Sequence, residues 1–341
     1  MEEDILTCIL QGSILGPILF LIYINDLHLI SNALTLMFAD DTLGLKAHAN
    51  LETLIAEVNN DINRMAIWFK ANKLVVNKSK TKYIIFKQRN KKIGGNLPKI
   101  VYDENEPGKP YSLDNVTELE RIHSKHDETD KRAYKLLGIY LDDGLTLDYH
   151  VNYLIKKLNR SLFCIRNAKN YLNNTGLRSL YFALIHSHLS YCPTIISCTS
   201  NSNINKLFKL QKKAIRIITN SSYNAHTLPL FYQHKILPLT KIFLYDKLKF
   251  MHAINYNYAI KSFENVWNKN INRDLNVHLR NDDLFQLPAP NIELFKKLPL
   301  YSLPYEWNNS GDLKFYENLV TFNCALKNKL FDEVLFETGL N

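Results

Sequence analysis

The chain has 341 residues, of which 46% are hydrophobic and 22% are charged, so its composition is that of a folded globular protein long enough for two or three domains. This composition excludes an intrinsically disordered chain and a collagen-like repeat. The 42 Lys and Arg against 33 Asp and Glu leave a formal net charge of +9, which indicates a polyanionic partner without naming its class.

The first 24 residues predict neither a secretory signal nor a membrane span. Residues 2–4 are acidic where a signal peptide has a basic stretch. The apolar run Ile5–Ile24 contains Gly12, Gly16 and Pro17, which would break a membrane helix in its first half. Five cysteines at irregular spacing favour reduced thiols over a disulfide framework. We therefore expect a protein of the cytoplasm, the nucleus or both, without a membrane partner.

Residues 34–47 predict a β-hairpin with an acidic turn. Two short β-prone segments flank the adjacent pair Asp40 and Asp41. Two neighbouring carboxylates on a turn repel each other unless cations neutralise them, and such hard oxygen ligands suit Mg²⁺ or Mn²⁺. Asp is also a common residue of solvated turns, so the dipeptide alone does not decide between a metal site and an ordinary turn.

A helix, a strand and an insertion are expected after this hairpin. Apolar residues recur at helical spacing on one face from Leu51 to Phe69. Residues 83–86 predict a strand. The stretch from 89 to 131 is rich in Gly, Pro and charged residues, which indicates a long surface insertion without chemistry, whose best strand is Lys99–Asp103.

The positive charge is concentrated between Asp148 and Asp246. The 97 intervening residues hold thirteen Lys and Arg and no Asp or Glu, and their apolar spacing predicts three helices near 151–165, 177–188 and 204–218. The basic side of the last helix carries Lys206, Lys209, Lys212, Lys213 and Arg216. A charged helix face is often merely solvated, but the lack of any compensating carboxylate favours binding to a nucleic-acid backbone.

The C-terminal region predicts packing rather than chemistry. An amphipathic pattern from Phe315 to Val334 indicates a helix that packs on the preceding module. Residues His186, His188, Cys192 and Cys198 have ligand-type side chains, but their spacing matches no usual zinc site, so we expect core or helix-surface roles.

Four motifs follow one another along the chain. They are Gln-Gly-Ser at 11–13, Phe-Ala-Asp-Asp at 38–41, Asn-x-x-Lys-Thr at 77–81 and Leu-Gly at 137–138. This series resembles the reverse transcriptases of non-LTR retrotransposons, of the LINE type and nearest to the jockey-like elements. The resemblance extends to the basic segment 210–219 and becomes thin beyond about Met251.

The resemblance implies an α+β fold in three parts. Residues 1–145 would form a partial polymerase palm with an antiparallel sheet, helices and a surface insertion at about 89–131. Residues 146–250 would form a basic, all-α thumb-like domain, and residues 251–341 a mainly helical region of unknown role.

The resemblance also implies roles for single residues. The catalytic residues would be Asp40, Asp41 and Lys80, with both aspartates binding two Mg²⁺ or Mn²⁺ ions and the lysine protonating pyrophosphate. The pocket of the incoming dNTP would be lined by Gln11, Gly12 and Ser13, and the primer end gripped by Leu137 and Gly138. The five basic residues of 206–216 would contact the backbone of an RNA template paired with a DNA primer or an RNA–DNA hybrid.

One catalytic part of this family has no match here. A polymerase of this class needs a further aspartate upstream of the Gln-Gly-Ser block, yet only Asp4 precedes it, and that position is too close to Gln11. No fingers-type region precedes the block. We therefore expect a reverse-transcriptase domain, made for RNA-templated DNA synthesis by two-metal nucleotidyl transfer, that is N-terminally truncated and inactive as an isolated chain. The alternative is a non-catalytic RNA- or DNA-binding remnant of a mobile element. A truncated element copy and an incomplete gene model both agree with the sequence.

Overall fold

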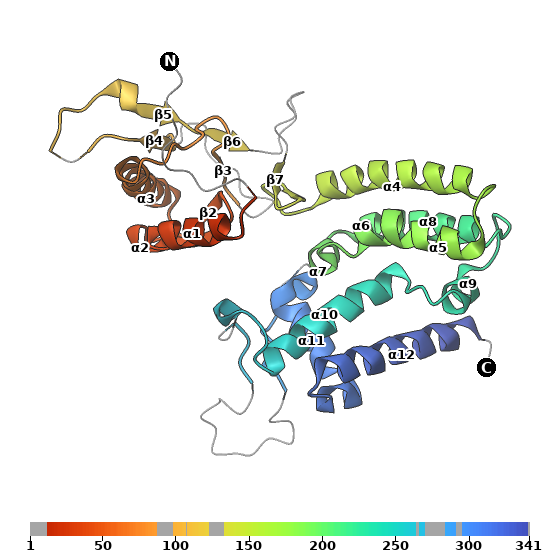
Figure 1. Ribbon diagram of the computed structural model, residues 1–341. Coiled ribbons are helices and arrows are strands. Elements are labelled where there is room, and N and C mark those ends of the chain that lie inside the picture. Colours follow the sequence, from red (N-terminus) through yellow and green to blue (C-terminus); the bar gives the residue numbers. More distant parts are fainter. Residues whose placement is uncertain are drawn as a thin grey trace, which may run out of the picture. The chain divides into compact units, whose positions relative to one another are not determined.

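The computed structural model describes residues 12–86, 98–106, 108–122, 133–263, 266–269, 284–290 and 295–339. They belong to two compact units, Met1–Ala133 and Tyr134–Asn341, which we describe separately. Most strands lie in the first unit, and the long helices other than α3 lie in the second (Figure 1). The predicted α+β class is confirmed, whereas the division at residues 145 and 250 stays a prediction. Within the described ranges, no helix is both long and apolar enough to cross a bilayer.

The first unit consists of short paired strands around one long helix. Its helices are α1 (Leu15–Ile24), α2 (Leu27–Ile30), α3 (Leu51–Ala71) and the short η1 (Leu113–Asn115). Its strands are β1 (Leu34–Phe38), β2 (Asp41–Leu45), β3 (Lys82–Ile84), β4 (Val101–Asp103), β5 (Val116–Glu118) and β6 (Glu120–Ile122). The pairs β1–β2 and β4–β5 are antiparallel, and β3–β6 is parallel. The helix expected at 51–69 and the strands expected near 83 and 101 are confirmed.

Helix α3 is the centre of the first unit. The Asn50 side chain caps it by accepting the backbone N–H groups of Glu52 and Thr53 at 2.8 and 3.1 Å. The sequence pattern predicted one apolar face, but α3 has two. One face packs through Ile55 against β4, and the other packs through Trp68 against α1 and α2. A helix that is covered on two sides needs apolar residues on both of these faces. Its apolar residues therefore extend around more of its circumference than a single stripe.

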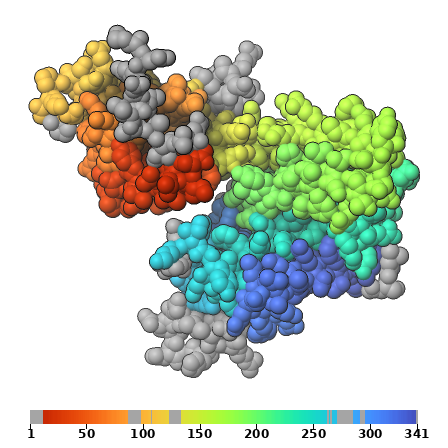
Figure 2. Space-filling view, viewed as in Figure 1, coloured from red at the N-terminus to blue at the C-terminus, as the bar shows by residue number. Residues whose placement is uncertain are grey.

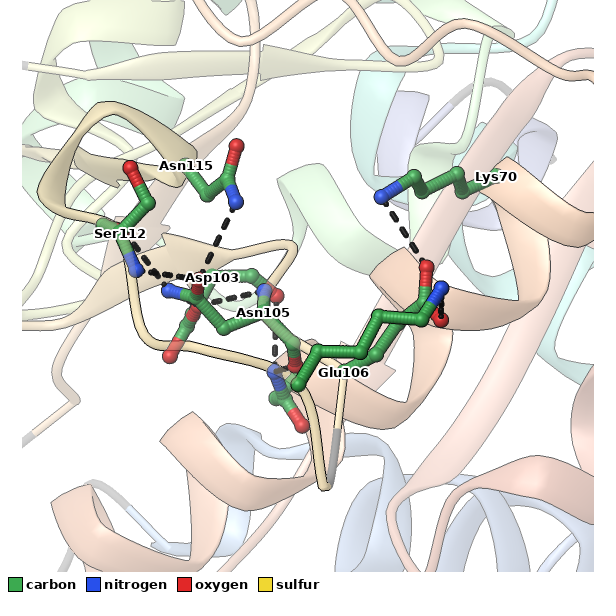
Figure 3. Close-up of polar contacts among 8 residues, drawn as sticks. Lys70, Asp103, Asn105, Glu106, Ser112 and Asn115 are labelled. Atoms are coloured by element: carbon green, nitrogen blue, oxygen red, sulfur yellow. Dashed lines mark hydrogen bonds and ion pairs between the residues drawn. The ribbon is translucent and has the colours of Figure 1, made fainter.

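Polar side chains close the loop between β4 and β5 and attach it to α3 (Figure 3). The Asn105 side chain donates to Asp103 at 2.8 Å and accepts from the Ser112 backbone N–H at 2.9 Å. At the end of α3, Lys70 pairs with Glu106 at 3.1 Å. The described part of the expected insertion is therefore a folded hairpin whose contacts are structural.

The second unit is mainly helical. It begins with the strands β7 (Tyr134–Leu136) and β8 (Ile139–Leu141). The helices that follow are α4 (Asp148–Ala168), α5 (Asn174–Tyr181), the π-helical turn η2 (Phe182–His186), α6 (Ser187–Leu189), α7 (Pro193–Ile196), α8 (Asn201–Ile218), α9 (Thr227–Gln233) and α10 (Leu239–Asn255). The C-terminal elements are η3 (Lys261–Phe263), η5 (Phe295–Lys297), α11 (Pro299–Asn308), η6 (Gly311–Phe315) and α12 (Leu319–Thr338).

Two apolar cores hold this unit together. The first lies between α4, α5, α8 and α9, and the second between α10, α11 and α12. Helix α12 joins them, because its Val334 is buried in the first core and its Leu326 and Leu330 are buried in the second. Its Glu333 also accepts from Lys241 of α10 at 2.6 Å. The expectation that the last helix packs on the preceding module is confirmed.

Candidate functional site

The acidic pair lies where the hairpin was predicted. Strands β1 and β2 are antiparallel, Phe38 pairs with Asp41, and Ala39 and Asp40 form the two-residue turn. Ala39 has a left-handed φ of 51°, a conformation that costs energy for a residue with a Cβ and often marks a functional turn. The predicted hairpin is confirmed, and it holds both carboxylates at one tip.

The environment of the two carboxylates is open. Both Asp40 and Asp41 are exposed, and neither forms an ion pair with a described residue. Among the residues that the structure describes, no three His, Cys, Asp or Glu side chains come together as a metal cluster. The tip therefore offers two hard oxygen ligands of the kind that Mg²⁺ prefers, which fits part of a metal site.

A buried ion pair anchors both ends of this hairpin to α3. Asp61 of α3 is 5% exposed. One of its oxygens accepts the Asn32 backbone N–H at 3.2 Å, just before β1, and the other accepts Lys46 Nζ at 2.7 Å, just after β2. The bond to Asp61 raises the pKa of the Lys46 ammonium. The sequence pattern did not predict this anchor. The feature that could have indicated it is a charged residue, Asp61, on the apolar helix face that also holds Val58.

Replacing this anchor should loosen the acidic turn. We expect Asp61→Ala to lower the free energy of unfolding by about 2 kcal/mol, because it removes the shorter of two charge-assisted bonds to the half-enclosed Lys46 ammonium, whose other described partner is Glu57 at 3.3 Å. Faster hydrogen exchange of the β1–β2 amides would show that the effect is local. The exposed Asp114 offers a control, and Asp114→Ala should change neither quantity. Equal exchange in both variants would contradict the anchoring role.

The Gln-Gly-Ser block precedes α1. Gln11 lies outside the described residues. Gly12 has a φ of 89°, which a residue with a side chain rarely adopts. The Ser13 hydroxyl accepts the Gly16 backbone N–H at 3.1 Å, so it stabilises the first turn of α1. The nucleotide-binding role of the block stays a prediction.

Most apolar residues of helix α1 are exposed, and Ile24 at its end is buried. The exposed apolar side chains of α1 include Leu15, Ile18, Leu21 and Ile22, and those of β1 include Leu34, Leu36 and Phe38. Exposed apolar side chains in this number are typical of a contact with another molecule or polypeptide.

Lys80 differs from the lysines beside it. Lys78 pairs with Glu104 at 3.3 Å, and Lys82 pairs with Glu120 at 2.8 Å. Lys80 is exposed and pairs with no described carboxylate. Its backbone N–H is held by the Asn77 side chain at 3.2 Å. Of these three ammonium groups, that of Lys80 is therefore the one left available for a phosphate.

The Leu-Gly pair forms the tip of the β7–β8 hairpin. Leu137 and Gly138 both have positive φ, 44° and 89°, as the two-residue turns that match strand twist require. Tyr191, from the segment between α6 and α7, donates its hydroxyl to the Leu137 carbonyl. A Cβ on Gly138 would lie 3.2 Å from the Tyr191 ring. Tyr191 thus braces the tip, a contact between residues 54 positions apart that sequence reasoning missed.

The basic residues of α8 divide into two groups. Arg216 donates through Nε and Nη2 to the Ala225 carbonyl at 3.0 and 2.9 Å, so it holds the loop after the helix. Lys212 Nζ lies 4.3 Å from the centre of the Phe208 ring. The side chains of Lys206, Lys209 and Lys213 are exposed. These three residues, which we call the α8 lysines, are the part of the predicted face that is open to a ligand.

The surroundings of the α8 lysines are basic as well. Helix α8 packs against α4, whose exposed residues include Lys156, Arg160 and Arg166, and α4 lies at the surface of the second unit (Figure 2). None of the twelve basic residues from Lys156 to Lys235 pairs with a carboxylate of the described residues, whereas the thirteenth of the acid-free stretch, Lys241, pairs with Glu333. The positive field of this region is therefore not compensated locally.

The four His and Cys residues rejected as a zinc site are dispersed in the second unit. Burial lowers the pKa of His186 and His188 and raises the pKa of the Cys192 and Cys198 thiols. The Cys198 thiol donates to the Lys297 carbonyl at 3.2 Å. These contacts are those of core and helix-surface residues.

Comparison with known proteins tests the resemblance of the four motifs to reverse transcriptases. The chain is 22% identical, over 281 residues, to a probable RNA-directed DNA polymerase from transposon X-element of Drosophila melanogaster. The match covers 80% of this chain and 27% of that protein, so the chain spans about a quarter of the length of this relative. No protein-family model and no solved structure matches the chain. The similarity confirms the resemblance to transposon reverse transcriptases that the motifs predicted.

Proposed function

We propose that this chain is part of the reverse transcriptase of a non-LTR retrotransposon and that its complete form carries out RNA-templated DNA synthesis. The observation that carries the proposal is the β1–β2 tip, which presents two adjacent carboxylates at the position of the Phe-Ala-Asp-Asp motif. The similarity to a transposon RNA-directed DNA polymerase supports the same assignment.

Each part of the chain then has a task. Asp40 and Asp41 would hold Mg²⁺ or Mn²⁺ ions, which in this chemistry align a primer 3′-oxygen with the α-phosphate of a dNTP and stabilise the developing charge. The free ammonium of Lys80 would protonate the departing pyrophosphate. The braced tip at Leu137 and Gly138 would position the primer, and the α8 lysines would contact the backbone of the RNA–DNA hybrid.

Localised Mn²⁺ binding tests the metal site without requiring turnover. We expect Mn²⁺ to broaden the amide NMR signals of residues 38–42 first, because paired carboxylates are the preferred ligands of this ion. Asp40→Asn should abolish this local broadening, and Asp114→Asn, which removes an exposed carboxylate elsewhere in the same unit, should leave it. Uniform broadening across the unit that Asp40→Asn does not change would refute the site.

The isolated 341-residue chain should not extend a primer. The described residues supply two carboxylates at the tip, and two-metal catalysis needs a further ligand to position both ions. A primer-extension assay with Mg²⁺, dNTPs and an RNA template measures this directly. Processive extension that disappears in Asp40→Asn would show that the chain carries a complete site.

The second candidate is a non-catalytic RNA- or DNA-binding remnant. The unpaired basic residues of α4 and α8 favour it, since they need no metal to bind phosphates. Nucleic-acid binding without the localised Mn²⁺ effect would support this candidate over the polymerase.

A further inference from the structure

A polar cavity of about 340 Å³ lies in the second unit, lined by α7, α10, α11 and η5. Helices α10 and α11 run beside each other there (Figure 1). This volume is within the range of about 300–1,000 Å³ that small-molecule sites occupy. The cavity involves neither the acidic tip nor the α8 lysines, so it is independent of the site proposed above.

The charge of the lining is positive. Lys247, Lys296 and Lys297 line the cavity, and Glu306 is the one carboxylate beside them. Lys247 is half-buried and forms no ion pair with a described residue. Burial lowers the pKa of Lys247 and raises the pKa of Glu306, and the attraction between these two charges offsets the shifts only in part. Lys297 Nζ contacts a neutral group, Asn201 Oδ1, at 2.9 Å. An anion entering the cavity would therefore meet a lining with three lysines and one carboxylate, which is positive overall.

A buried hydroxyl in the lining lacks a partner. Ser302 is 5% exposed, and its Oγ makes no hydrogen bond within the structure. A buried hydroxyl without a partner is costly, and such groups in a protein interior call for an explanation such as a ligand or a bound water. An oxygen of a bound anion would accept this hydrogen bond.

One wall of the cavity is aromatic. Tyr301 and Tyr305 lie one turn apart on α11, their rings are inclined by 17°, and their centroids are 5.7 Å apart. Tyr305 is 45% exposed, so part of its side chain is accessible to a ligand. Two nearly parallel rings beside an ammonium group suit a planar base attached to a phosphate, because bases stack on aromatic side chains irrespective of their identity.

We propose that this cavity binds a nucleotide unit, with its phosphate at Lys247 and Ser302 and its base against Tyr301 and Tyr305. The site goes beyond the proposed polymerase function, because it gives the C-terminal part of the chain a nucleic-acid contact of its own. The same chemistry is found in a free mononucleotide and in the end of a single strand.

The full chain tests the proposal with three probes: AMP, inorganic phosphate and a 5′-phosphorylated ten-residue oligothymidylate. With labelled tyrosines, AMP should shift the NMR signals of Tyr301 and Tyr305, and phosphate alone should shift them less. Lys247→Met and Tyr305→Ala should each weaken AMP binding about tenfold, since each removes one contact to the phosphate or the base. Competition by the oligonucleotide identifies a strand end as the ligand; its absence identifies the mononucleotide.

Matched controls separate this site from general charge. Lys249→Met removes an exposed lysine two positions away on α10, and Tyr223→Ala removes a tyrosine that is 78% exposed. Both should leave AMP binding unchanged.

Because Tyr305 is at the surface, its variant should fold even if Lys247→Met does not. Unmoved Tyr301 and Tyr305 signals at saturating AMP, or equal losses in Tyr305→Ala and Tyr223→Ala, would overturn the proposal. Replacing the α8 lysines should not affect AMP binding, so failure of either proposal can be recognised separately.

Discussion

Replacing the α8 lysines Lys206, Lys209 and Lys213 by alanine is expected to weaken binding of an RNA–DNA hybrid on the order of 100-fold at 0.1 M salt, because each phosphate contact releases condensed counterions. The slope of log affinity against log salt should become less steep by about 2 to 3. Salt-dependent fluorescence anisotropy measures both quantities. Folding should be retained, since the three side chains are exposed.

A second triple variant provides the control for charge alone. Lys249, Lys261 and Lys327 are also exposed lysines of the second unit, but they lie outside the acid-free stretch. Their replacement by alanine removes the same charge and should change affinity far less. Equal losses in the two triple variants would show that net charge, rather than the face of α8, determines binding. Binding that does not depend on salt would contradict both nucleic-acid functions.

Acid should destabilise the second unit strongly. Burial lowers the pKa of His150, His186 and His252 below the ordinary value of 6.5, and each has a buried ring nitrogen without a partner. His252 is fully buried and stacks on Phe322 at 4.2 Å between ring centroids. Its Nε2 lies 2.8 Å from the Tyr316 carbonyl, so Nε2 carries the proton and Nδ1 is the bare nitrogen.

The direction of the effect comes from proton linkage. Below pH 6.5 these histidines bind protons in the unfolded chain but stay neutral in the folded chain, because their folded-state pKa values are lower. The histidines therefore contribute their full stability above pH 6.5. This stability is lost as the pH falls towards the folded-state pKa values. Each histidine contributes a loss of up to about 1.4 kcal/mol per pH unit in this window. Urea unfolding of the full chain at pH 7.5 and 5.5 measures the loss. His252→Gln should reduce the pH dependence, and an unchanged dependence would exclude His252 as a source.

The sequence predicted the features that neighbouring residues determine. Alternating β-prone residues around Asp40 and Asp41 indicated the hairpin, and apolar spacing indicated α3 and α8, because turns and amphipathic helices depend on residues a few positions apart. The acid-free stretch after Asp148 likewise indicated a basic helical region before any fold was known. Motif order predicted the family resemblance for the same reason, since each motif is a short local pattern.

The sequence pattern was less informative about what each side chain does. Spacing placed Arg216 with the lysines of α8, yet its guanidinium binds the Ala225 carbonyl. Spacing also predicted a single apolar face for α3, although the helix packs on two sides. Periodicity records which residues share a helix face, but it does not record which of them meet a partner from elsewhere in the chain.

By itself, the sequence determined the acidic turn, the basic helices and the relation to transposon polymerases, because these rest on local spacing and composition. The tertiary structure alone decided how the turn is anchored, which cations remain free and where a cavity forms. Lys46 meets Asp61 across 15 positions, Tyr191 meets Leu137 across 54, and Lys297 meets Thr199 across 98. Such pairs form only when packing brings distant segments together. Their two members follow no regular spacing along the chain, so the sequence pattern does not indicate them.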